Sequence, residues 1–142
     1  MPKVTPPGFT SAPDRGTVGV PVTTLASVLI GVVAALHVSF LVLEMFLWAT
    51  PFGVKTFRRP LAELQQSKVL AANQGLYNGF LAAGLVWSLV AAEPLHTPLA
   101  FFFLTCVLVA GLYGAATVGR SILFAQALPA ALALGAVFLA RS

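Results

Sequence analysis

The sequence predicts an all-α membrane protein, a bundle of four transmembrane helices. Of its 142 residues, 58% are hydrophobic and only 8% are charged, whereas an ordinary soluble domain has roughly a quarter of its residues charged. Four apolar runs are also each long enough to cross the hydrocarbon layer of a membrane as a helix. A soluble core could not bury this much apolar surface, so lipid must solvate most of it.

The four runs are Val22–Trp48, Val69–Ala92, Leu99–Val118 and Ile122–Ala140. Residues 1–21 are rich in Pro, Gly, Thr and Ser and contain no apolar stretch, so they are predicted to form a mobile tail. The chain therefore divides into a tail at 1–21 and one transmembrane domain at 22–142.

Basic residues in the short connections predict the orientation, because Lys and Arg are retained on the cytoplasmic side. Five of them lie in the first and third connections, and three lie beyond the two ends of the bundle. We therefore expect both termini outside. The five are Lys55, Arg58, Arg59, Lys68 and Arg120, and the three are Lys3, Arg15 and Arg141.

The net charge of +4 does not predict a nucleic-acid partner, because the sequence has neither a basic and aromatic recognition stretch nor a zinc-binding spacing. The same lack of a ligand cluster predicts no metal site. We interpret the cations as determinants of topology that also meet anionic lipid headgroups.

Polar side chains cluster at the start of the second run, where a membrane helix is normally apolar. Asn73, Gln74, Tyr77 and Asn78 fall within an arc of roughly 140°, because successive helical residues turn by about 100°. An amide in hydrocarbon needs a partner, so this face should meet another helix, a water-filled cavity or a ligand. Two interpretations stay open: hydrogen bonds between helices alone, or a ligand site.

Small residues repeat every four positions on the adjoining face of the same run, at Ala71, Gly75, Gly79 and Ala83. This spacing allows two membrane helices to approach closely. The approach could occur within one bundle or between copies, in a homo-oligomer.

The first run carries His37 and Glu44 on one helical stripe. A carboxylate inside an apolar helix is by default a functional candidate, and its alternative is a residue that reaches toward the membrane surface. A lone membrane histidine is more often a hydrogen-bonding core residue than a ligand. Glu44 is therefore the stronger candidate.

Tyr113 in the third run and Gln126 in the fourth extend the polar set, and Pro129 can kink its helix because it lacks a backbone donor. At a rise of about 1.5 Å per residue, five polar side chains lie roughly 6–9 Å below the cytoplasmic face. We therefore predict a cavity at this depth, and a contact from the polar face of the second helix to Glu44 or Tyr113. The five are Glu44, Asn73, Gln74, Tyr113 and Gln126, while His37 and Asn78 lie one layer deeper and Arg120 stands at the rim.

The connection after the first run mixes aromatic and basic residues from Pro51 to Arg59. This mixture is typical of a short amphipathic element in the headgroup plane, where it would cover the mouth of the cavity. A solvated basic loop is the alternative.

Several segments resemble a known family. The resemblance is to the bacterial four-helix membrane proteins catalogued as domain of unknown function thirteen-oh-four, and it covers about Val22 to Ala140. It implies a small multi-pass protein of the bacterial cytoplasmic (inner) membrane and no particular activity. The segments are Ala35–Trp48, Lys68–Leu85, Gly111–Gly114 and Gln126–Ala130.

The stretch Ala72–Gly79 is also similar to a motif of the membrane-bound styrene oxide isomerases, four-helix proteins that bind haem b and rearrange epoxides. The motif here is one residue shorter, and Asn73 stands where that family has its haem-ligating histidine. An amide is a poor iron ligand, so haem is disfavoured as a cofactor. If haem is bound, His37 is the remaining imidazole within a spanning run.

Three functions fit the sequence. An enzyme such as an isomerase would act on a small lipophilic molecule, with Glu44 and Tyr113 as catalytic residues. A carrier or binding protein for a small solute or lipid would use Glu44 as a protonation or ion site. A structural assembly subunit would use the amides only for packing. The candidate substrate-binding residues are His37, Asn73, Gln74, Tyr77, Asn78, Gln126 and Arg120.

Overall fold

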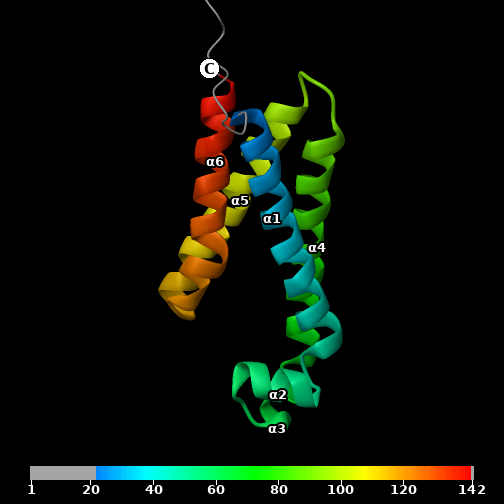
Figure 1. Cartoon of the computed structure of the whole chain (residues 1–142). Coiled ribbons are helices and arrows are strands. Elements are labelled where there is room, and N and C mark those ends of the chain that lie inside the picture. The colour runs from blue at the N-terminus through cyan, green and yellow to red at the C-terminus, as the bar shows by residue number, and fades with distance from the viewer. Residues whose placement is uncertain (1–21, 142) are drawn as a thin grey trace, which may run out of the picture.

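A computed structural model describes residues 22–141, whose regular elements are all helical. Long helical segments run up and down a bundle, and two short helices lie at one end of it (Figure 1). The tail predicted for residues 1–21 lies outside the described residues. In chain order the elements are α1 (Val22–Val42), the π-helical turn η1 (Leu43–Leu47), α2 (Pro51–Phe57), α3 (Leu61–Gln66), α4 (Lys68–Val90), α5 (His96–Thr117), the π-helical turn η2 (Leu123–Ala127) and α6 (Leu128–Ala140).

Three helical segments of the described chain are long and apolar enough to cross a membrane, namely Thr23–Leu47, His96–Thr117 and Leu123–Ala140. Only 28%, 22% and 28% of their most apolar stretches are buried inside the protein. A water-soluble monomer does not expose so much contiguous apolar surface, so these segments indicate a membrane protein. The fourth predicted span corresponds to α4, which has 23 residues but whose amide side chains lower its hydropathy.

Each π-helical turn precedes a proline, and the missing N–H of that proline explains why the regular α-helix is interrupted there. Pro129 has no N–H to offer the carbonyl four residues earlier, and the N–H of Leu128 bonds to the carbonyl of Leu123, five residues back. Pro51 likewise cannot continue the first helix, and the hydroxyl of Thr50 donates to the Leu47 carbonyl at 2.7 Å. The helix irregularity expected at Pro129 is therefore present as a π-helical turn.

The hydrophobic core lies in the half of the bundle away from α2 and α3, where α1 packs along α4 and α6 and where α5 packs against both. No described residue of η1 or η2 belongs to it. Beyond the core the bundle divides into a first arm, formed by η1 and the adjoining half of α4, and a second arm, formed by η2 and the adjoining half of α5 (Figure 1). The core residues are Ala26, Ile30, Val33, Ala34, Leu85, Ala100, Leu104, Val107, Ala130, Ala133, Ala136 and Val137.

The close-packing face predicted for the second helix is found between α4 and the first helix. Gly75 and Gly79 both lie against Leu41, and a Cβ atom on Gly75 would stand 3.1 Å from the Leu41 carbonyl oxygen. Ala71 is also buried, whereas Ala83 is exposed. This ridge therefore serves packing within the chain.

The connection after the first helix is folded as α2 and α3 and is not an open loop. The Thr50 side chain caps α2 by accepting from the N–H of Gly53 at 3.3 Å, and α2 ends at Arg58 in the left-handed region with φ 53°. Gly53 packs directly against the carbonyls of Leu47 and Trp48 and leaves no room for a Cβ atom. The start of α2 is therefore fixed against the end of η1.

The approach of α5 to η2 depends on Gly111, because a Cβ atom there would lie 2.6 Å from the Ala127 nitrogen. We predict that Gly111→Ala lowers the free energy of unfolding by about 1–3 kcal/mol, since backbone must move to relieve the overlap. The matched control is Gly135→Ala, where a Cβ atom meets nothing within 4 Å. The control should leave the stability unchanged or raise it by up to about 1 kcal/mol. Unfolding by SDS in detergent micelles measures both, and equal stabilities would contradict the α5–η2 packing.

Candidate functional site

Glu44 in η1 and Asn78 in α4 form a hydrogen bond within the first arm. Asn78 Nδ2 donates to Glu44 Oε2 at 2.7 Å. Asn78 is buried and Glu44 is partly exposed, and the described chain supplies no donor to Oε1 of Glu44. The predicted contact between the polar set of the second helix and Glu44 is confirmed. One carboxylate oxygen is fixed by this bond, and the other is left for a different group.

His37 is fully buried where the two arms meet the core. A carbonyl can only accept, so His37 Nδ1 donates to the Val33 carbonyl at 2.8 Å, which leaves Nε2 as the acceptor of the ring. Gln126 Nε2 lies 3.4 Å from that atom, and the Phe40 ring meets the imidazole edge-on with centroids 5.5 Å apart. His37 thus joins α1 to η2 by a polar contact at the point of divergence.

The four polar side chains of α4 do not share one environment, which corrects the prediction of a single polar face. Asn73, Gln74 and Tyr77 are exposed, and Asn73 Nδ2 donates to the Val69 carbonyl of its own helix at 3.1 Å. The face that α4 turns inward follows Gly75 and Asn78 at helical spacing. Asn73, Gln74 and Tyr77 lie off that face and are therefore exposed.

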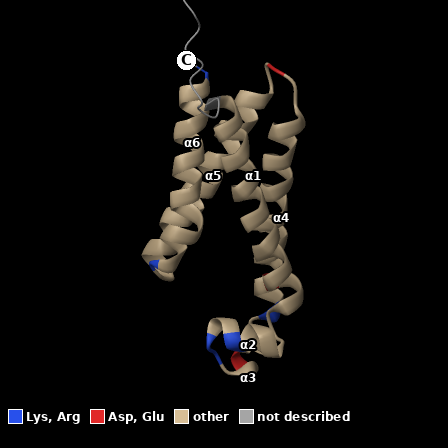
Figure 2. Ribbon diagram, viewed as in Figure 1, with Lys and Arg blue, Asp and Glu red and all other residues tan. Residues whose placement is uncertain are grey.

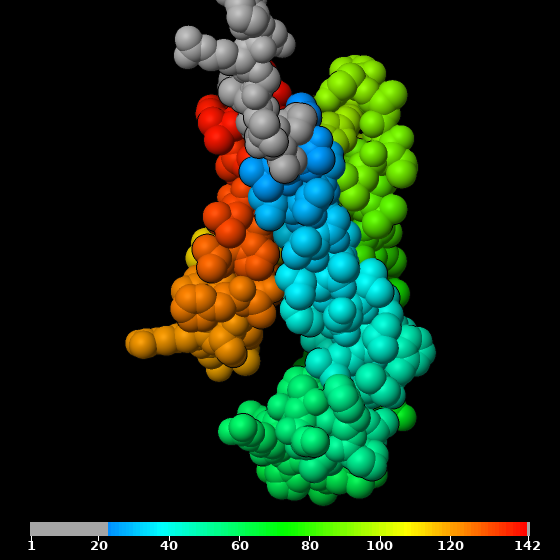
Figure 3. All heavy atoms as spheres, in the orientation of Figure 1, coloured from blue at the N-terminus to red at the C-terminus, as the bar shows by residue number. Residues whose placement is uncertain are grey.

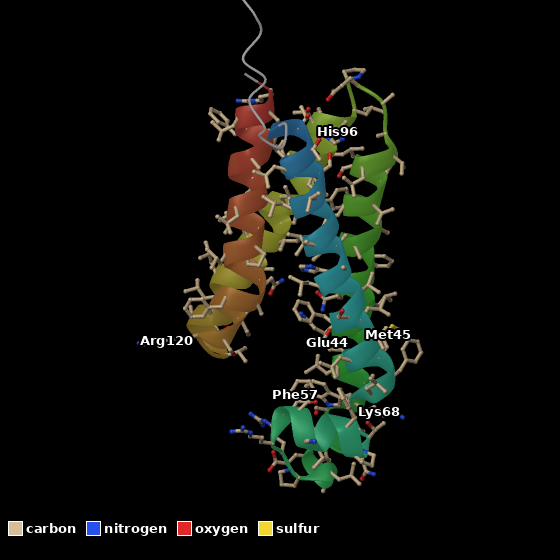
Figure 4. The ribbon with its side chains drawn as sticks, viewed as in Figure 1. Glu44, Met45, Phe57, Lys68, His96 and Arg120 are labelled. Carbon is tan, nitrogen blue, oxygen red and sulfur yellow. The ribbon has the colours of Figure 1, made fainter. Side chains whose placement is uncertain are left out.

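Tyr113 and Arg120 lie on the second arm. Within residues 22–141, neither forms a hydrogen bond or an ion pair with Glu44. Tyr113 is 71% exposed, and its carbonyl accepts from the Thr117 hydroxyl at 2.8 Å. Arg120 is exposed at the tip of the arm and extends away from the bundle (Figure 4). Only four of the nine predicted site residues are thus brought together, in two pairs, Glu44 with Asn78 and His37 with Gln126. The prediction that Asn73 and Tyr113 line one cavity with them is wrong, because both side chains are exposed.

A hollow separates the two arms. Figure 3 shows the surface recessed between the cyan end of the first arm and the orange end of the second, above the green α2. Glu44 lies on the side of η1 toward the second arm, with Phe57 of α2 below it (Figure 4). The Phe57 ring packs on Trp48 with centroids 4.3 Å apart, and Trp48 Nε1 donates to the Ser67 hydroxyl at 3.0 Å. We call the hollow between η1 and η2, beside Glu44 and Phe57, the fork.

A second hollow of about 370 Å³ lies at the opposite end of the bundle, beside His96, Glu93 and Arg141. Several of its polar groups have partners within the chain. His96 Nδ1 donates to the Ser88 carbonyl at 2.6 Å, Glu93 Oε1 accepts from Thr97 at 2.8 Å, and the Arg141 guanidinium stands over two phenylalanine rings. The fork is the stronger candidate because Glu44 lies within an apolar spanning segment, whereas Glu93 lies in a connection between helices.

The two residues considered as haem ligands, His37 and Asn73, are not placed to bind iron. The described chain has no group of three His, Cys, Asp or Glu residues that could hold a metal ion. His37 is buried with both ring nitrogens engaged, and Asn73 faces outward toward its own helix. Neither position offers iron an open axial ligand.

Comparison with known proteins identifies the family. The sequence profile described as Protein of unknown function (DUF1304) matches residues 31–138. The chain belongs to the DUF1304 family. A similar protein is the uncharacterized protein YpaA of Lactococcus lactis subsp. lactis (strain IL1403), which is 29% identical over 114 residues, 78% of this chain and 95% of its own length. No solved structure matches the chain.

The family resemblance predicted from the sequence is therefore confirmed, and the matched region of this DUF1304 chain includes every candidate site residue. The likeness to styrene oxide isomerases is not confirmed by these matches and stays a prediction.

Sequence reasoning missed the π-helical turn η1 of the DUF1304 chain and predicted only a kink at Pro129, where η2 lies; each turn carries one member of a polar pair. A signal for both was available, because Pro51 and Pro129 each follow within a few residues of the turn. It also missed the bond from Trp48 to Ser67, which no spacing rule predicts because it joins residues on separate elements.

The Glu44–Asn78 bond should appear as a coupling energy in a double-mutant cycle. We predict about 0.5–1.5 kcal/mol of coupling in the DUF1304 chain between Glu44→Ala and Asn78→Ala, the size of hydrogen bonds between membrane helices. Unfolding in SDS of the two single variants and the double variant measures it. Asn73→Ala is the matched control, because Asn73 bonds only within its own helix. Coupling of Glu44 to Asn73 as large as that to Asn78 would contradict the assignment.

Proposed function

We propose that this protein takes a small lipophilic molecule into the fork and isomerises it by proton transfer at Glu44. The observation that supports the proposal is the Glu44 carboxylate, with Oε2 fixed by Asn78 and Oε1 without a donor from residues 22–141. A positioned carboxylate of this kind can serve as a general base and then as a general acid. Oε1 accepts a proton from one atom of the molecule, and the carboxyl group returns it to another atom. The composition of the substrate does not change, so no second substrate is needed.

The position of Glu44 favours such chemistry over a role in packing. It is the one acidic residue within the three apolar spanning segments of the described chain. Ionisable residues inside membrane segments are rare and mark substrate or ion pathways. A packing residue would be expected to use both oxygens, whereas the second oxygen of Glu44 faces a hollow.

The fork suits a lipophilic substrate because ligand sites are usually concave, mainly apolar and furnished with a few convergent polar groups. The nearby aromatic rings of Phe57 and Trp48 supply apolar surface, and Glu44, held by Asn78, supplies the polar group. Tyr113 on the second arm remains a candidate for a second contact to the substrate.

We further propose that α4 is a fourth span, which gives a four-helix bundle in the bacterial cytoplasmic membrane with both termini outside. α4 runs beside α1 along the same axis, and the cations gather around α2, at the start of α4 and at Arg120 (Figure 2). Lys and Arg prefer the cytoplasmic side, so that end is placed inside. In a Cys106→Ser background, an impermeant maleimide applied to intact cells should label a cysteine at Leu95 and spare one at Gln65; the reverse pattern would contradict the orientation.

The experiment that tests the function begins with the protein purified in mild detergent. Native mass spectrometry and solvent extraction identify the molecule that it carries, and incubation with that molecule tests for an isomer of equal mass. Glu44→Gln keeps the shape and hydrogen bonding of the side chain but removes its titration. We predict that Glu44→Gln retains binding and loses isomerisation by about a hundredfold or more, the usual contribution of general acid–base catalysis.

Glu63→Gln is the control, because Glu63 is an exposed acid of α3 paired with Arg59 at 3.5 Å. It should leave the rate unchanged. Release of the molecule unaltered by both wild type and Glu44→Gln would favour a carrier. If nothing is bound and Glu44→Gln affects only stability, the proposal fails and an assembly subunit takes its place.

A further inference from the structure

We infer that the second arm carries a binding site for an anionic phospholipid of the surrounding leaflet, with one acyl chain in a groove between α5 and η2 and the headgroup on Arg120. This site is separate from the fork. The inference rests on the shape and lining of the groove, on the charge at its end and on the absence of any acidic partner for that charge in the described chain.

The groove has a volume of about 240 Å³ and is lined only by apolar side chains. Four of them, Leu112, Leu123, Phe124 and Leu128, are among the exposed large hydrophobic residues of the protein. It lies where Gly111 lets α5 and η2 approach, so it runs along the seam between two packed helical segments. A flexible hydrocarbon chain fits such a seam, because it needs no hydrogen-bond partner along its length.

Arg120 stands at the end of this seam. Its carbonyl accepts from the N–H of Leu123 at 3.1 Å, so the backbone of Arg120 lies within one helical turn of a groove-lining residue. The Arg120 side chain extends outward from that point (Figure 4). Arg120 is exposed and has no ion pair within residues 22–141, whereas Arg59 is paired with Glu63. An unpaired guanidinium at the polar end of an apolar groove is complementary to a phosphate joined to an acyl chain.

The other charges at this end do not offer an equivalent site. Lys55 lies in α2, Arg58 and Arg59 follow its end, and Lys68 begins α4 on the first arm (Figure 4). They raise the attraction of the whole end for anionic lipid. Lys68 is therefore a matched control for loss of one charge in the same leaflet without loss of the groove.

The test uses purified protein and two probes, phosphatidylglycerol and phosphatidylethanolamine, added in equal amounts and counted by native mass spectrometry. One basic residue near the membrane surface contributes about 1 kcal/mol to anionic lipid binding, which corresponds to a preference of about fivefold. We expect wild type and Lys68→Gln to show this preference for phosphatidylglycerol and Arg120→Gln to lose it. Phosphatidylglycerol should also raise the melting temperature of wild type more than that of Arg120→Gln.

A second variant tests the groove itself. Ala131 is an exposed lining residue, so Ala131→Phe should fill the groove without disturbing the core, and it should reduce phosphatidylglycerol binding while Arg120 is still present. Equal binding of the two lipids by wild type would overturn the inference. Equal loss of the preference in Lys68→Gln and Arg120→Gln would also overturn the inference, because the positive charge of the whole end would then explain the preference. Binding of phosphatidylglycerol by Ala131→Phe at the wild-type level would overturn it as well.

Discussion

A carboxylate and an amide in hydrocarbon each need a hydrogen-bond partner, and the rest of this structure depends on the bond between Glu44 and Asn78. Their bond of 2.7 Å requires α4 to lie very close to the first helix. Gly75 and Gly79 allow that approach because they present no side chain to Leu41. The small residues and the polar pair therefore act together. The glycines allow the two helices to come close, and the Glu44–Asn78 bond stabilises them at that distance, because hydrocarbon offers no water as an alternative partner.

Two prolines, Pro51 and Pro129, determine where the long helices become irregular. Each removes a backbone donor, and the helix before it widens into a π-helical turn that carries Glu44 in one case and Gln126 in the other. Such turns are frequent at functional sites, because they re-aim side chains that a regular helix would hold in register. Since the hydrophobic core is confined to the opposite half of the bundle, the two turns stand on separate arms, and the hollow between them is a consequence of the backbone.

Much of this architecture could be predicted from the sequence, because composition and periodicity determine which segments are helices in lipid. The candidates that could be found were those whose residue type alone is informative, such as Glu44 in an apolar run. The sequence could not predict which of two neighbouring side chains is buried. Tyr77 and Asn78 are adjacent in the chain, yet Asn78 is buried and Tyr77 is exposed. That difference depends on which face of α4 meets α1, and a 100° step per residue leaves several faces equally consistent with the pattern. The position of Tyr113 along its helix predicts the end of the bundle at which it lies. It does not predict the side of the helix from which its side chain projects.

The central claim is that Glu44 presents a reactive carboxyl group to a hollow that opens toward lipid. Dicyclohexylcarbodiimide tests it most directly, because this lipophilic reagent reaches carboxyl groups from the hydrocarbon phase and leaves a covalent mass label. The account predicts labelling at Glu44, protection by the bound lipophilic molecule and no label at that position in Glu44→Gln, while a water-soluble carbodiimide should label the exposed Glu63 and Glu93 instead. If dicyclohexylcarbodiimide leaves Glu44 unmodified in the folded protein and reacts with it only after unfolding, the carboxyl group is sealed within the helix packing, and the account is contradicted.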